Sequence, residues 1–436
     1  MSCSGLIVAA AASGSGKTTI TLAILRALRD RGIRVGSAKV GPDYIDPAFL
    51  AAATGHPCFN LDSWAMRPET IAATVESAGA GADLLIVEGV MGLFDGAADG
   101  TGSTAELAQL TGWPVILVLD VAGQGASAAA VARGFRDHGV GIAIAGVVAN
   151  RVGGASHRAM IERALVPLGI PLLGAFPRDE GIKLRDRHLG LVQAREHKDL
   201  EAILAHAAAR ADEHLDLDLL CSFAKPNRLK MPPEGTRSII PLGQRMAIAQ
   251  DHAFGFLYPH LTASWRSQGA EILPFSPLAD EGPHATADAI FLPGGYPELH
   301  AGKLASNRGF LEGLRDAAAR GAVVYGECGG YMVLGEGLID KAGHRHAMAR
   351  LLPLETSFER ARLHLGYREV RIARDTPLGS AGATFRGHEF HYASIVGEDD
   401  TAPLFSAVDA ASTTLGGYGC VRERVMGSFV HLIDRR

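Results

Sequence analysis

Short apolar runs recur along the first half of the chain, and each is followed by polar residues or glycine. The runs cover residues 6–10, 33–39, 84–87, 115–119, 144–149 and 172–176. Helical patterns lie between several of them, and the first is an apolar stripe from Ile20 to Leu28 that Gly32 ends. Such alternation predicts a parallel sheet with helices on both faces. Because ligands bind at the carboxyl ends of the strands in such sheets, the residues directly after each run are the first candidates for chemistry.

A second α/β pattern begins near residue 246. It predicts strands at 246–250, 272–275, 289–292 and 322–325, and helices near 256–267 and 310–320. Between the two patterns lies a polar stretch that is rich in proline and glycine and has little periodicity, which is typical of a linker. At 436 residues the chain is too long for one hydrophobic core. We therefore predict an α/β domain over residues 1–225, a linker over 226–243 and a second α/β domain over 244–436.

The first apolar run leads into a glycine-rich loop, and a helical pattern starts at its end. The loop and the helix start read Gly14, Ser15, Gly16, Lys17, Thr18 and Thr19. Small residues let backbone N–H groups approach phosphates, and the helix N-terminus adds the positive end of its dipole. In such a P-loop, Lys17 reaches the β- and γ-phosphates of ATP and the Thr18 hydroxyl binds Mg²⁺. The usual pattern has a further glycine where this chain has Ala11, and a plain turn before an ordinary helix is the alternative; the strand–loop–helix context favours nucleotide binding.

Acidic residues follow two neighbouring apolar runs. Asp43 and Tyr44 come after the second run, whereas Glu88 ends the third and Asp95 lies in the loop beyond it. Mg²⁺ takes oxygen ligands from one or two carboxylates together with substrate phosphates, so Asp43 and Glu88 are the predicted metal ligands beside Thr18. Taken singly, each acid reads as a helix cap or a solvated loop residue; together behind a P-loop they favour a metal site.

Three further polar residues follow later runs. Asp120 is a weaker candidate that fits a helix cap equally well. Asn150 and Arg151 are candidates for contact with adenine, although asparagine after a strand is a common turn residue.

A basic stretch covers residues 178–197. It contains Arg178, Lys183, Arg185, Arg187, His188, Arg195 and His197. Two interpretations stay open, a solvated face and a binding surface for a polyanionic small molecule.

The fourth predicted strand of the second half runs straight into Gly326-Glu327-Cys328-Gly329-Gly330. A strand that meets a helix through G-x-C-x-G is a nucleophile elbow with cysteine as the nucleophile. Glycines on both sides permit the strained turn, and the helix N-terminus is expected to lower the pKa of the thiol. Gly294 and Gly295 follow a neighbouring strand, and their backbone N–H groups are the predicted oxyanion hole. A buried, inert cysteine in a glycine-rich turn is the alternative.

A cysteine nucleophile needs a base, and the chain has 17 histidines. His431 ends a short apolar strand near the C-terminus, from which a loop could aim it at Cys328. The rival segment contains His388 and His391, which a strand would place on opposite faces and which therefore make a poor metal pair. The residues favour His431.

Composition narrows the class of protein. The net charge of −5 argues against a nucleic-acid partner held by phosphate neutralisation. Five scattered cysteines without a C-x-x-C pair indicate neither a disulfide framework nor a structural zinc site, but a reducing compartment. No apolar stretch approaches the roughly 20 residues that span a bilayer, and the first apolar run is only a few residues long and leads directly into the P-loop, so we do not expect it to be a signal peptide. We therefore expect a cytoplasmic protein without a nucleic-acid or membrane partner, and a homodimer is one of the oligomeric states left open.

A P-loop half joined to a cysteine-elbow half resembles a glutamine-dependent amidoligase. In detail the chain resembles the cobyrinic acid a,c-diamide synthase family of the cobalamin pathway, including its hydrogenobyrinic acid variant. The matching segments, in the order of the family, are S-G-S-G-K-T-T (13–19), K-V-G-P-D-Y-I-D-P (39–47), V-E-G-V-M-G-L-F-D-G (87–96), R-H-L-G-L (187–191), L-P-G-G-Y-P-E (292–298), G-E-C-G-G-Y-M (326–332) and G-H-E-F-H-Y (387–392). They span nearly the whole chain, and their combination is far more specific than any one of them.

The resemblance implies a dethiobiotin-synthetase-like ATP domain followed by a class I (triad-type) glutaminase domain. It carries Cys328 over as nucleophile and His431 as its base. Class I glutaminases have an acid two residues after this histidine, whereas this chain has Ile433. We therefore expect a slow glutaminase that is active mainly when the other site is loaded.

The resemblance also implies the substrates, which are ATP with Mg²⁺, L-glutamine and a corrin, either hydrogenobyrinic or cobyrinic acid. The a and c acetate carboxylates would each be converted to an acyl phosphate and then amidated by ammonia from glutamine. Asp43, Tyr44, Asp95 and Arg187 are the predicted substrate-binding residues, and the basic stretch suits so acidic a ligand.

Other reactions and another class of protein stay open. The related reactions are those of nickel sirohydrochlorin a,c-diamide synthase and cobyric acid synthase. CTP synthase shares the two-domain logic, but it is longer and keeps the His-x-Glu that this chain lacks. The other class is a P-loop partitioning or scaffold ATPase with an inert second domain, which would leave the Cys328 elbow unexplained.

Overall fold

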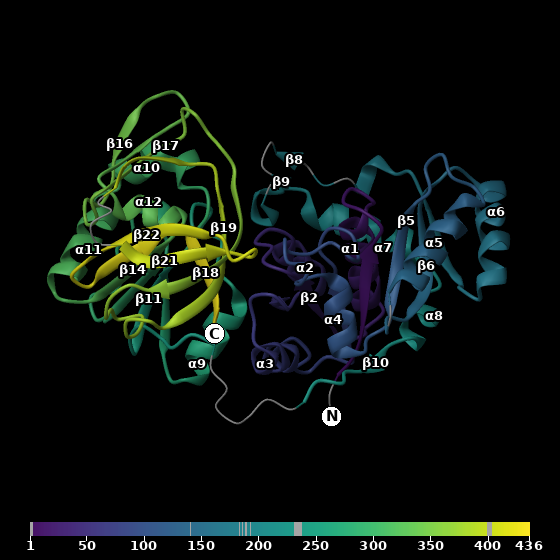
Figure 1. Ribbon diagram of the computed structural model, residues 1–436. Coiled ribbons are helices and arrows are strands. Elements are labelled where there is room, and N and C mark those ends of the chain that lie inside the picture. The colour runs from purple at the N-terminus through teal and green to yellow at the C-terminus, as the bar shows by residue number, and fades with distance from the viewer. Residues whose placement is uncertain are drawn as a thin grey trace. The chain divides into compact units, whose positions relative to one another are not determined.

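The computed structural model describes residues 3–139, 141–182, 184, 186–187, 190–191, 193–230, 238–398 and 403–436. The chain forms two compact units (Figure 1), one of Met1–Trp64 with Pro68–Glu234 and the other of Ala65–Arg67 with Gly235–Arg436. Of the predicted linker, residues 231–237 lie outside the described part of the chain. Among the described residues, no helix combines the length and the apolar character needed to cross a membrane.

The first unit is built on one sheet, whose strands all run parallel except β10. Its order is β3-β2-β4-β1-β5-β6-β7, and β10 pairs antiparallel with β1. The strands are β1 (Ser4–Ala10), β2 (Val35–Val40), β3 (Cys58–Leu61), β4 (Leu84–Glu88), β5 (Val115–Asp120), β6 (Ile144–Val152), β7 (Leu172–Pro177) and β10 (Lys225–Pro226). Each of the six apolar runs lies largely within a strand. The pattern missed β3, which has only four residues and includes Asn60.

Helices cover both faces of this sheet. They are α1 (Lys17–Asp30), α2 (Asp46–Thr54), α3 (Pro68–Ala78), α4 (Thr104–Thr111), α5 (Ser127–His138), α6 (Ala155–Leu165), α7 (Leu200–His214) and α8 (Leu217–Ser222). Short 3₁₀ turns and a two-stranded ribbon complete the unit, namely η1 (Val166–Leu168), η2 (Glu180–Ile182), β8 (Asp186–Arg187), β9 (Gly190–Leu191) and η3 (Ala194–Glu196).

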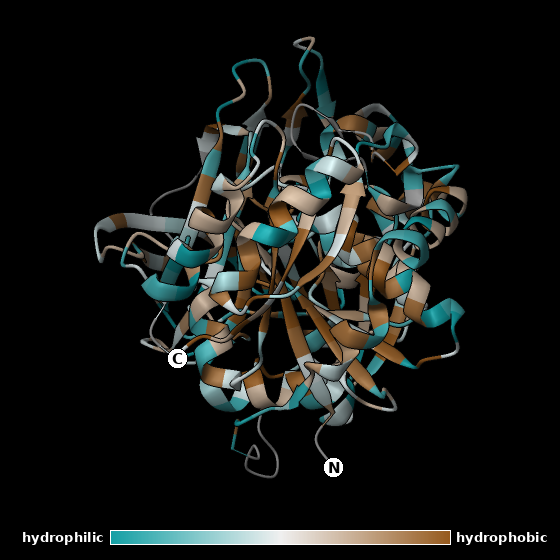
Figure 2. Ribbon diagram, turned by 90° about the vertical axis from the view of Figure 1, so that its right-hand side faces the viewer, coloured by the Kyte–Doolittle hydropathy of each residue, from teal (hydrophilic) through white to brown (hydrophobic). Residues whose placement is uncertain are grey.

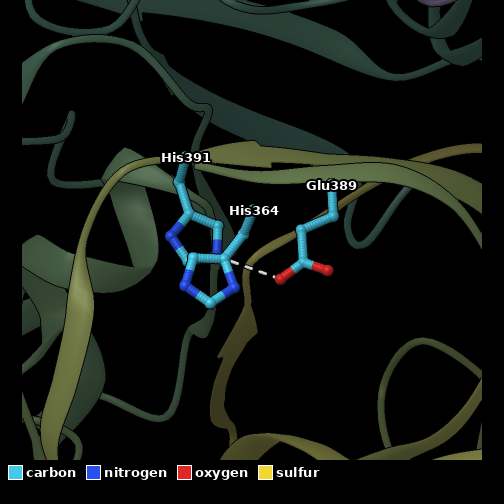
Figure 3. Close-up of side chains that lie close together, drawn as sticks. All are labelled: His364, Glu389 and His391. Atoms are coloured by element: carbon cyan, nitrogen blue, oxygen red, sulfur yellow. Dashed lines mark hydrogen bonds and ion pairs between the residues drawn. The ribbon is translucent and has the colours of Figure 1, made fainter. Parts of the chain in front are cut away.

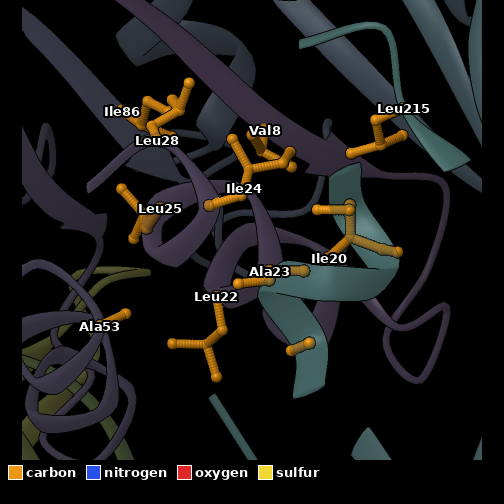
Figure 4. Close-up of a cluster of buried hydrophobic side chains, with 14 of the residues drawn as sticks. Val8, Ile20, Leu22, Ala23, Ile24, Leu25, Leu28, Ala53, Ile86 and Leu215 are labelled. Carbon is orange, nitrogen blue, oxygen red and sulfur yellow. The ribbon is translucent and has the colours of Figure 1, made fainter. Parts of the chain in front are cut away.

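Strand β5 shows how the sheet separates two apolar cores. Ile116 and Val118 belong to the cluster that contains α1, whereas Leu117 and Leu119 belong to the cluster that contains α5 and α6. Side chains of a strand alternate between the faces, so this strand is buried on both. In Figure 4 the apolar face of α1, with Ile20 and Ile24 among its residues, packs against strand residues such as Val8. Figure 2 shows the same arrangement as brown strands surrounded by helices that carry teal segments.

The second unit has a ten-stranded mixed sheet in the order β12-β11-β13-β14-β23-β22-β21-β18-β19-β24. Neighbours from β12 to β23 are parallel and the remaining pairs are antiparallel. The strands are β11 (Arg245–Ala249), β12 (Glu271–Phe275), β13 (Ala289–Leu292), β14 (Val323–Glu327), β18 (His364–Ile372), β19 (Thr384–His391), β21 (Pro403–Asp409), β22 (Thr414–Arg422), β23 (Val425–Ser428) and β24 (Val430–Arg435). The four predicted strands correspond to β11 to β14.

A smaller sheet and six helical segments complete this unit. The sheet has the order β16-β15-β17-β20, formed by β15 (Gly337–Ile339), β16 (Arg345–Ala347), β17 (Leu354–Ser357) and β20 (Ser394–Glu398). The helices are α9 (Pro259–Ser267), η4 (Pro277–Ala279), η5 (Pro297–His300), α10 (Ala301–Ser306), α11 (Arg308–Ala319) and α12 (Gly329–Leu334). The two helices predicted from the sequence correspond to α9 and α11.

Candidate functional sites

The predicted P-loop lies between β1 and α1. Gly14 and Gly16 have φ angles of 77° and 86°, a left-handed conformation that glycine adopts without strain. A β-carbon on Gly16 would also lie 2.1 Å from Asn150 Nδ2. That amide nitrogen donates a hydrogen bond of 2.9 Å to the carbonyl of Ser15. Asn150, a candidate for adenine contact, thus holds the backbone of the loop.

Acidic residues from two strand ends meet at the start of α1. Lys39 of β2 and Glu88 of β4 are register partners on adjacent parallel strands, which brings the ends of the two strands together. The Thr18 hydroxyl donates to Glu88 Oε1 at 2.6 Å, and the Lys39 ammonium donates to the same oxygen at 2.8 Å. Lys39 also donates to Asp46 Oδ2 at 2.5 Å and lies 3.7 Å from Asp43 Oδ2. The predicted Asp43 and Glu88 thus lie around one buried ammonium, with the predicted Thr18 bonded to Glu88, and the sequence analysis missed Lys39 and Asp46.

The charges of this cluster are stabilised by pairing. Burial acts to lower the pKa of Lys39, but the carboxylates of Asp46, Glu88 and Asp43 outweigh it and raise that pKa well above its ordinary value. Burial, together with the charge of Asp46, raises the pKa of Asp43 to about 6. For Lys17, burial and the nearby ammonium of Lys39 lower the pKa. A dense set of charges is therefore held at the phosphate end of the P-loop.

The predicted substrate-binding residues are spread around this site. Asp43 Oδ1 accepts the backbone N–H groups of Ile45 and Asp46, which fixes the turn into α2, and Tyr44 lies within that turn. Asp95 Oδ2 accepts the N–H of Gly92 at 2.8 Å, so its observed contact is within its own loop.

The basic stretch is described only in part. Arg187 belongs to β8, but its side chain and that of Arg195 lie outside the described structure, as do Lys183, Arg185 and His188 altogether. Of the residues that are described, Arg178 is exposed and pairs with Glu180 at 3.1 Å.

A cavity of about 250 Å³ adjoins the P-loop. Its lining includes Ala11 to Ser15 on one side, and Asp120, Gln124 and Arg151 from the ends of β5 and β6 and the loop beyond β5. The Arg151 guanidinium pairs with Asp120 and also donates to the carbonyl of Gly14 at 3.3 Å. The candidates Asp120 and Arg151 therefore line one cavity beside the phosphate loop.

The cysteine elbow has the strained backbone that the sequence predicts. Cys328 has φ 49° and ψ −107° between β14 and α12, a conformation that costs a non-glycine residue about 1–3 kcal/mol. Its flanking glycines are required for space. A β-carbon on Gly326 would lie 2.7 Å from the carbonyl carbon of Gly330, and one on Gly330 would lie 2.0 Å from the carbonyl oxygen of Leu292.

The thiol of Cys328 is only 2% exposed and donates to the carbonyl of Phe390 at 3.4 Å. Burial raises its pKa, and the charge of Glu298 acts in the same direction. The backbone N–H of Gly329 has the opposite effect but is outweighed. The predicted lowering of the thiol pKa is therefore wrong for this resting site, because desolvation is stronger than the contribution from the start of a six-residue helix.

His431 and Cys328 meet at the backbone of Gly294. A β-carbon on Gly294 would lie 2.9 Å from His431 Nε2 and 3.2 Å from Cys328 Cβ. Burial, and next the neighbouring His388 and His391, lower the pKa of His431 well below its ordinary value. The imidazole is therefore neutral at pH 7, which is the form that a general base requires.

Gly295 lies close to the residue that follows the nucleophile. A β-carbon on Gly329 would lie 3.1 Å from the Gly295 nitrogen, and one on Gly295 would lie 2.1 Å from the carbonyl of Ala253. The carbonyl of Gly294 accepts the N–H of Phe256 at 2.9 Å. The sequence analysis did not include Gly329, although the residue after the nucleophile of an elbow ordinarily offers its N–H to the oxyanion.

The rival histidine segment forms a separate network on β18 and β19. Figure 3 shows the rings of His364 and His391 stacked beside Glu389, and the donor atoms of these residues all lie within 4.8 Å of one another. His391 Nε2 donates to Glu389 Oε1 at 2.9 Å, and Arg368 donates to Glu389 Oε2 at 2.7 Å. Because the guanidinium already neutralises this carboxylate, we read the group as a structural network rather than a cation site. His388 is instead the register partner of Tyr367 on β18 and of His431 on β24.

Comparison with known proteins gives one consistent picture. The family model of the CobQ/CobB/MinD/ParA nucleotide binding domain matches residues 6–192, and that of the CobB/CobQ-like glutamine amidotransferase domain matches residues 245–436. A curated protein from Brucella anthropi, named hydrogenobyrinate a,c-diamide synthase, is 53% identical over 432 residues, which are 99% of this chain and 98% of that protein. Proteins of the same name from Rhizobium meliloti and Rhodobacter capsulatus are 51% and 52% identical, covering 99% and 98% of this chain and the same shares of their own lengths.

The chain belongs to the hydrogenobyrinate a,c-diamide synthase family. It is an enzyme, a glutamine-dependent ligase with a nucleotide-binding domain and a glutamine amidotransferase domain. The resemblance and the α/β fold class predicted from the sequence are confirmed. The scaffold ATPase with an inert second domain is not supported, because the second half matches an amidotransferase family along its whole length.

Proposed function

We propose that this protein uses ATP and L-glutamine to amidate the a and c acetate carboxylates of a corrin, hydrogenobyrinic or cobyrinic acid, in cobalamin biosynthesis. The observation that carries the proposal is one chain with two sites, a P-loop beside paired carboxylates and a cysteine elbow beside a neutral histidine. The names of its full-length relatives supply the corrin and the positions amidated. The cytoplasm is the proposed compartment, in keeping with five free cysteines.

In the glutaminase half, Cys328 attacks the carboxamide carbon of glutamine. His431 Nε2 takes the thiol proton and returns it to the leaving nitrogen, so that the C–N bond breaks and ammonia leaves a thioester. Water, deprotonated by the same imidazole, then attacks the thioester and releases glutamate. Backbone N–H groups of Gly294 and Gly295 are the proposed donors to the oxyanion, together with that of Gly329.

In the synthetase half, an oxygen of the substrate carboxylate attacks the γ-phosphorus of ATP and ADP leaves. The resulting acyl phosphate reacts with ammonia and releases phosphate. A free carboxylate does not react with ammonia in this way, because it lacks a good leaving group. Positioning and charge neutralisation supply most of the rate of phosphoryl transfer, and Lys17 with the backbone from Gly14 to Thr19 would hold the phosphates. Asp43, Tyr44, Asp95 and Arg187 are the proposed contacts of the corrin.

Thr18, Asp43 and Glu88 are the proposed ligands of a Mg²⁺ ion that arrives with ATP. The donor set fits this ion, because it offers only oxygens and Glu88 Oε2 is buried without a hydrogen-bond partner among the described residues. When bound, Mg²⁺ would neutralise phosphate charge. Lys39 holds Glu88 and Asp46 in place on the same side of the loop.

Mass spectrometry of the products tests the proposal. Purified protein would be incubated with ATP, glutamine and, in separate reactions, hydrogenobyrinic acid, cobyrinic acid or nickel sirohydrochlorin. We expect one of the two corrins to lose two hydroxyl groups in exchange for two amino groups, with two ATP consumed. Exclusive amidation of nickel sirohydrochlorin, or of side chains other than a and c, would contradict the proposal.

A further inference from the structure

Glu327, the residue before the nucleophile, is a buried acid that the mechanism above does not use. It ends β14 and is only 3% exposed. Its Oε1 accepts the backbone N–H of Leu432 at 3.1 Å, and its Oε2 lies 3.9 Å from Nδ1 of His431. One carboxyl group therefore contacts the strand that carries the proposed base and also faces the ring of that base.

We propose that Glu327 is the positioning acid of the glutaminase site. It takes the place of the acid that class I glutaminases carry two residues after the histidine, where this chain has Ile433. The proposal rests on the roles assigned above to Cys328 and His431. Here the acid comes from the strand of the nucleophile instead of the strand of the base.

The two ring nitrogens of His431 face different groups. Nε2 lies on the side of Gly294 and Cys328, whereas Nδ1 lies on the side of Glu327. In its ionised form, which prevails above the pKa of about 8 that burial gives it, Glu327 favours the tautomer with the proton on Nδ1, which leaves the lone pair of Nε2 free for the thiol proton. It also stabilises the imidazolium that forms when Cys328 gives up that proton.

A second acid near this site is already occupied. Glu389 on β19 accepts hydrogen bonds from His391 and Arg368, and so does not depend on His431 for a partner. Glu327 is also attached to the backbone beside His431, which keeps the acid and the ring together in any movement of β24. Burial raises the pKa of Glu327 to about 8, and the backbone N–H of Leu432 acts in the opposite direction.

The decisive variant is Glu327→Gln. Its amide oxygen can still accept the N–H of Leu432, so the strand contact is kept. Its NH₂ group donates toward Nδ1 and so favours the tautomer protonated at Nε2, which cannot accept the thiol proton. We expect the kcat for glutamine hydrolysis to fall by about 10²–10⁴-fold with little change in KM, as when a triad acid is replaced by its amide.

Three measurements separate positioning from a structural role. Ammonia-dependent synthesis and the melting temperature should stay near the wild-type values. Above pH 8, where Glu327 is ionised, nitrogen-15 NMR of labelled histidine should show the His431 proton on Nδ1 in the wild type and on Nε2 in Glu327→Gln. Glu327→Asp keeps the charge at a shorter reach, and we expect it to recover part of the lost rate. Glu355→Gln, which removes the charge of a partly exposed acid paired with Arg345 on the smaller sheet, is the control and should leave glutamine hydrolysis unchanged.

The outcomes are distinguishable. If Cys328→Ser and His431→Ala leave glutamine use intact, the proposed function fails for this site. If those two variants abolish it while Glu327→Gln hydrolyses glutamine within about threefold of wild type, only the role of Glu327 is overturned. An unchanged His431 tautomer in Glu327→Gln above pH 8, whatever the rate, would overturn it as well.

Discussion

The two candidate sites keep their titratable groups in opposite states. Beside the P-loop, the ammonium of Lys39 is stabilised by Asp46, Glu88 and Asp43, and its pKa is raised despite full burial. At the elbow, burial shifts Cys328, His431 and Glu327 toward their neutral forms. At rest, the P-loop site therefore holds paired charges, whereas the elbow site holds groups with little charge.

The difference follows from what each site has to bind. ATP and an acyl phosphate carry several negative charges, so a site for them needs fixed charges that pair in their absence. Glutamine presents a neutral amide to the elbow, and charge develops there only during the reaction. A neutral resting site restrains idle hydrolysis of glutamine, which agrees with the expectation of a slow glutaminase.

The largest expected effect separates the two sites directly. Cys328→Ser removes the thiolate nucleophile, so glutamine-dependent synthesis should be abolished while synthesis from free ammonia continues. Product formation with each nitrogen source, followed by mass spectrometry, is the measurement. Loss of both activities in a protein with a normal melting temperature would contradict the independence of the two sites.

Lys17→Ala tests the P-loop site, and it should affect synthesis but not glutamine hydrolysis. Removing the lysine at the β- and γ-phosphates should lower synthesis by about 10³-fold or more with either glutamine or ammonia. Basal glutamine hydrolysis, measured as glutamate released, should persist. Near-normal synthesis would show that the loop does not hold the phosphates in the proposed way.

His431→Ala tests which histidine is the base. Loss of a general base should lower glutamine hydrolysis by roughly 10²–10⁴-fold. His391→Ala is the comparison, because that ring donates to Glu389 and stacks on His364 and Phe429 rather than facing Gly294. A comparable loss from His391→Ala, with no loss from His431→Ala, would transfer the role to the other segment.

The sequence predicted the parallel strands of both units better than the antiparallel strands. Parallel strands covered on both faces appear in the sequence as apolar runs, and these runs located six strands of the first unit and β11 to β14 of the second. The antiparallel strands β18 and β22 were missed. Strand β18 is only half-buried or exposed up to Glu369 and is buried only at Val370 and Ile372, and β22 contains three glycines, so neither carries a clear apolar signal.

The sites were predicted where a motif is local and missed where strands bring distant residues together. The Cys328 elbow and the P-loop are continuous segments, and their glycines indicate the local backbone conformation. Lys39 was passed over because it lies within a strand, and only its register with Glu88 places it among acids. Glu327 was given no role, since its relation to His431, about 100 residues later, depends on how β14 and β24 pack.

Lys39→Met would test the stability side of the contrast. It removes the ammonium that pairs with Asp43, Asp46 and Glu88 and leaves these buried acids without that partner, which should cost about 3–5 kcal/mol of folding free energy. Thermal and denaturant unfolding without nucleotide would measure the loss. Lys198→Met, at an exposed position of the same unit, is the control and should change little. Equal stability of the two variants would mean that the cluster is not held by its charges.

The smallest expected effect concerns the reactivity of the resting thiol. Because burial raises the pKa of Cys328, less thiolate is present at any given pH than in free cysteine, and alkylation by iodoacetamide should be slower. The rate should rise with pH and show no plateau below the pKa of an ordinary thiol. Peptide mass spectrometry would follow Cys328 separately from the partly exposed Cys3 and Cys221. If ATP and corrin accelerate the labelling, loading of the synthetase site converts the neutral thiol to a more reactive state. If Cys328 of the unliganded protein is instead labelled faster than free cysteine at pH 7, both sites rest in a charged state, and the contrast between them is wrong.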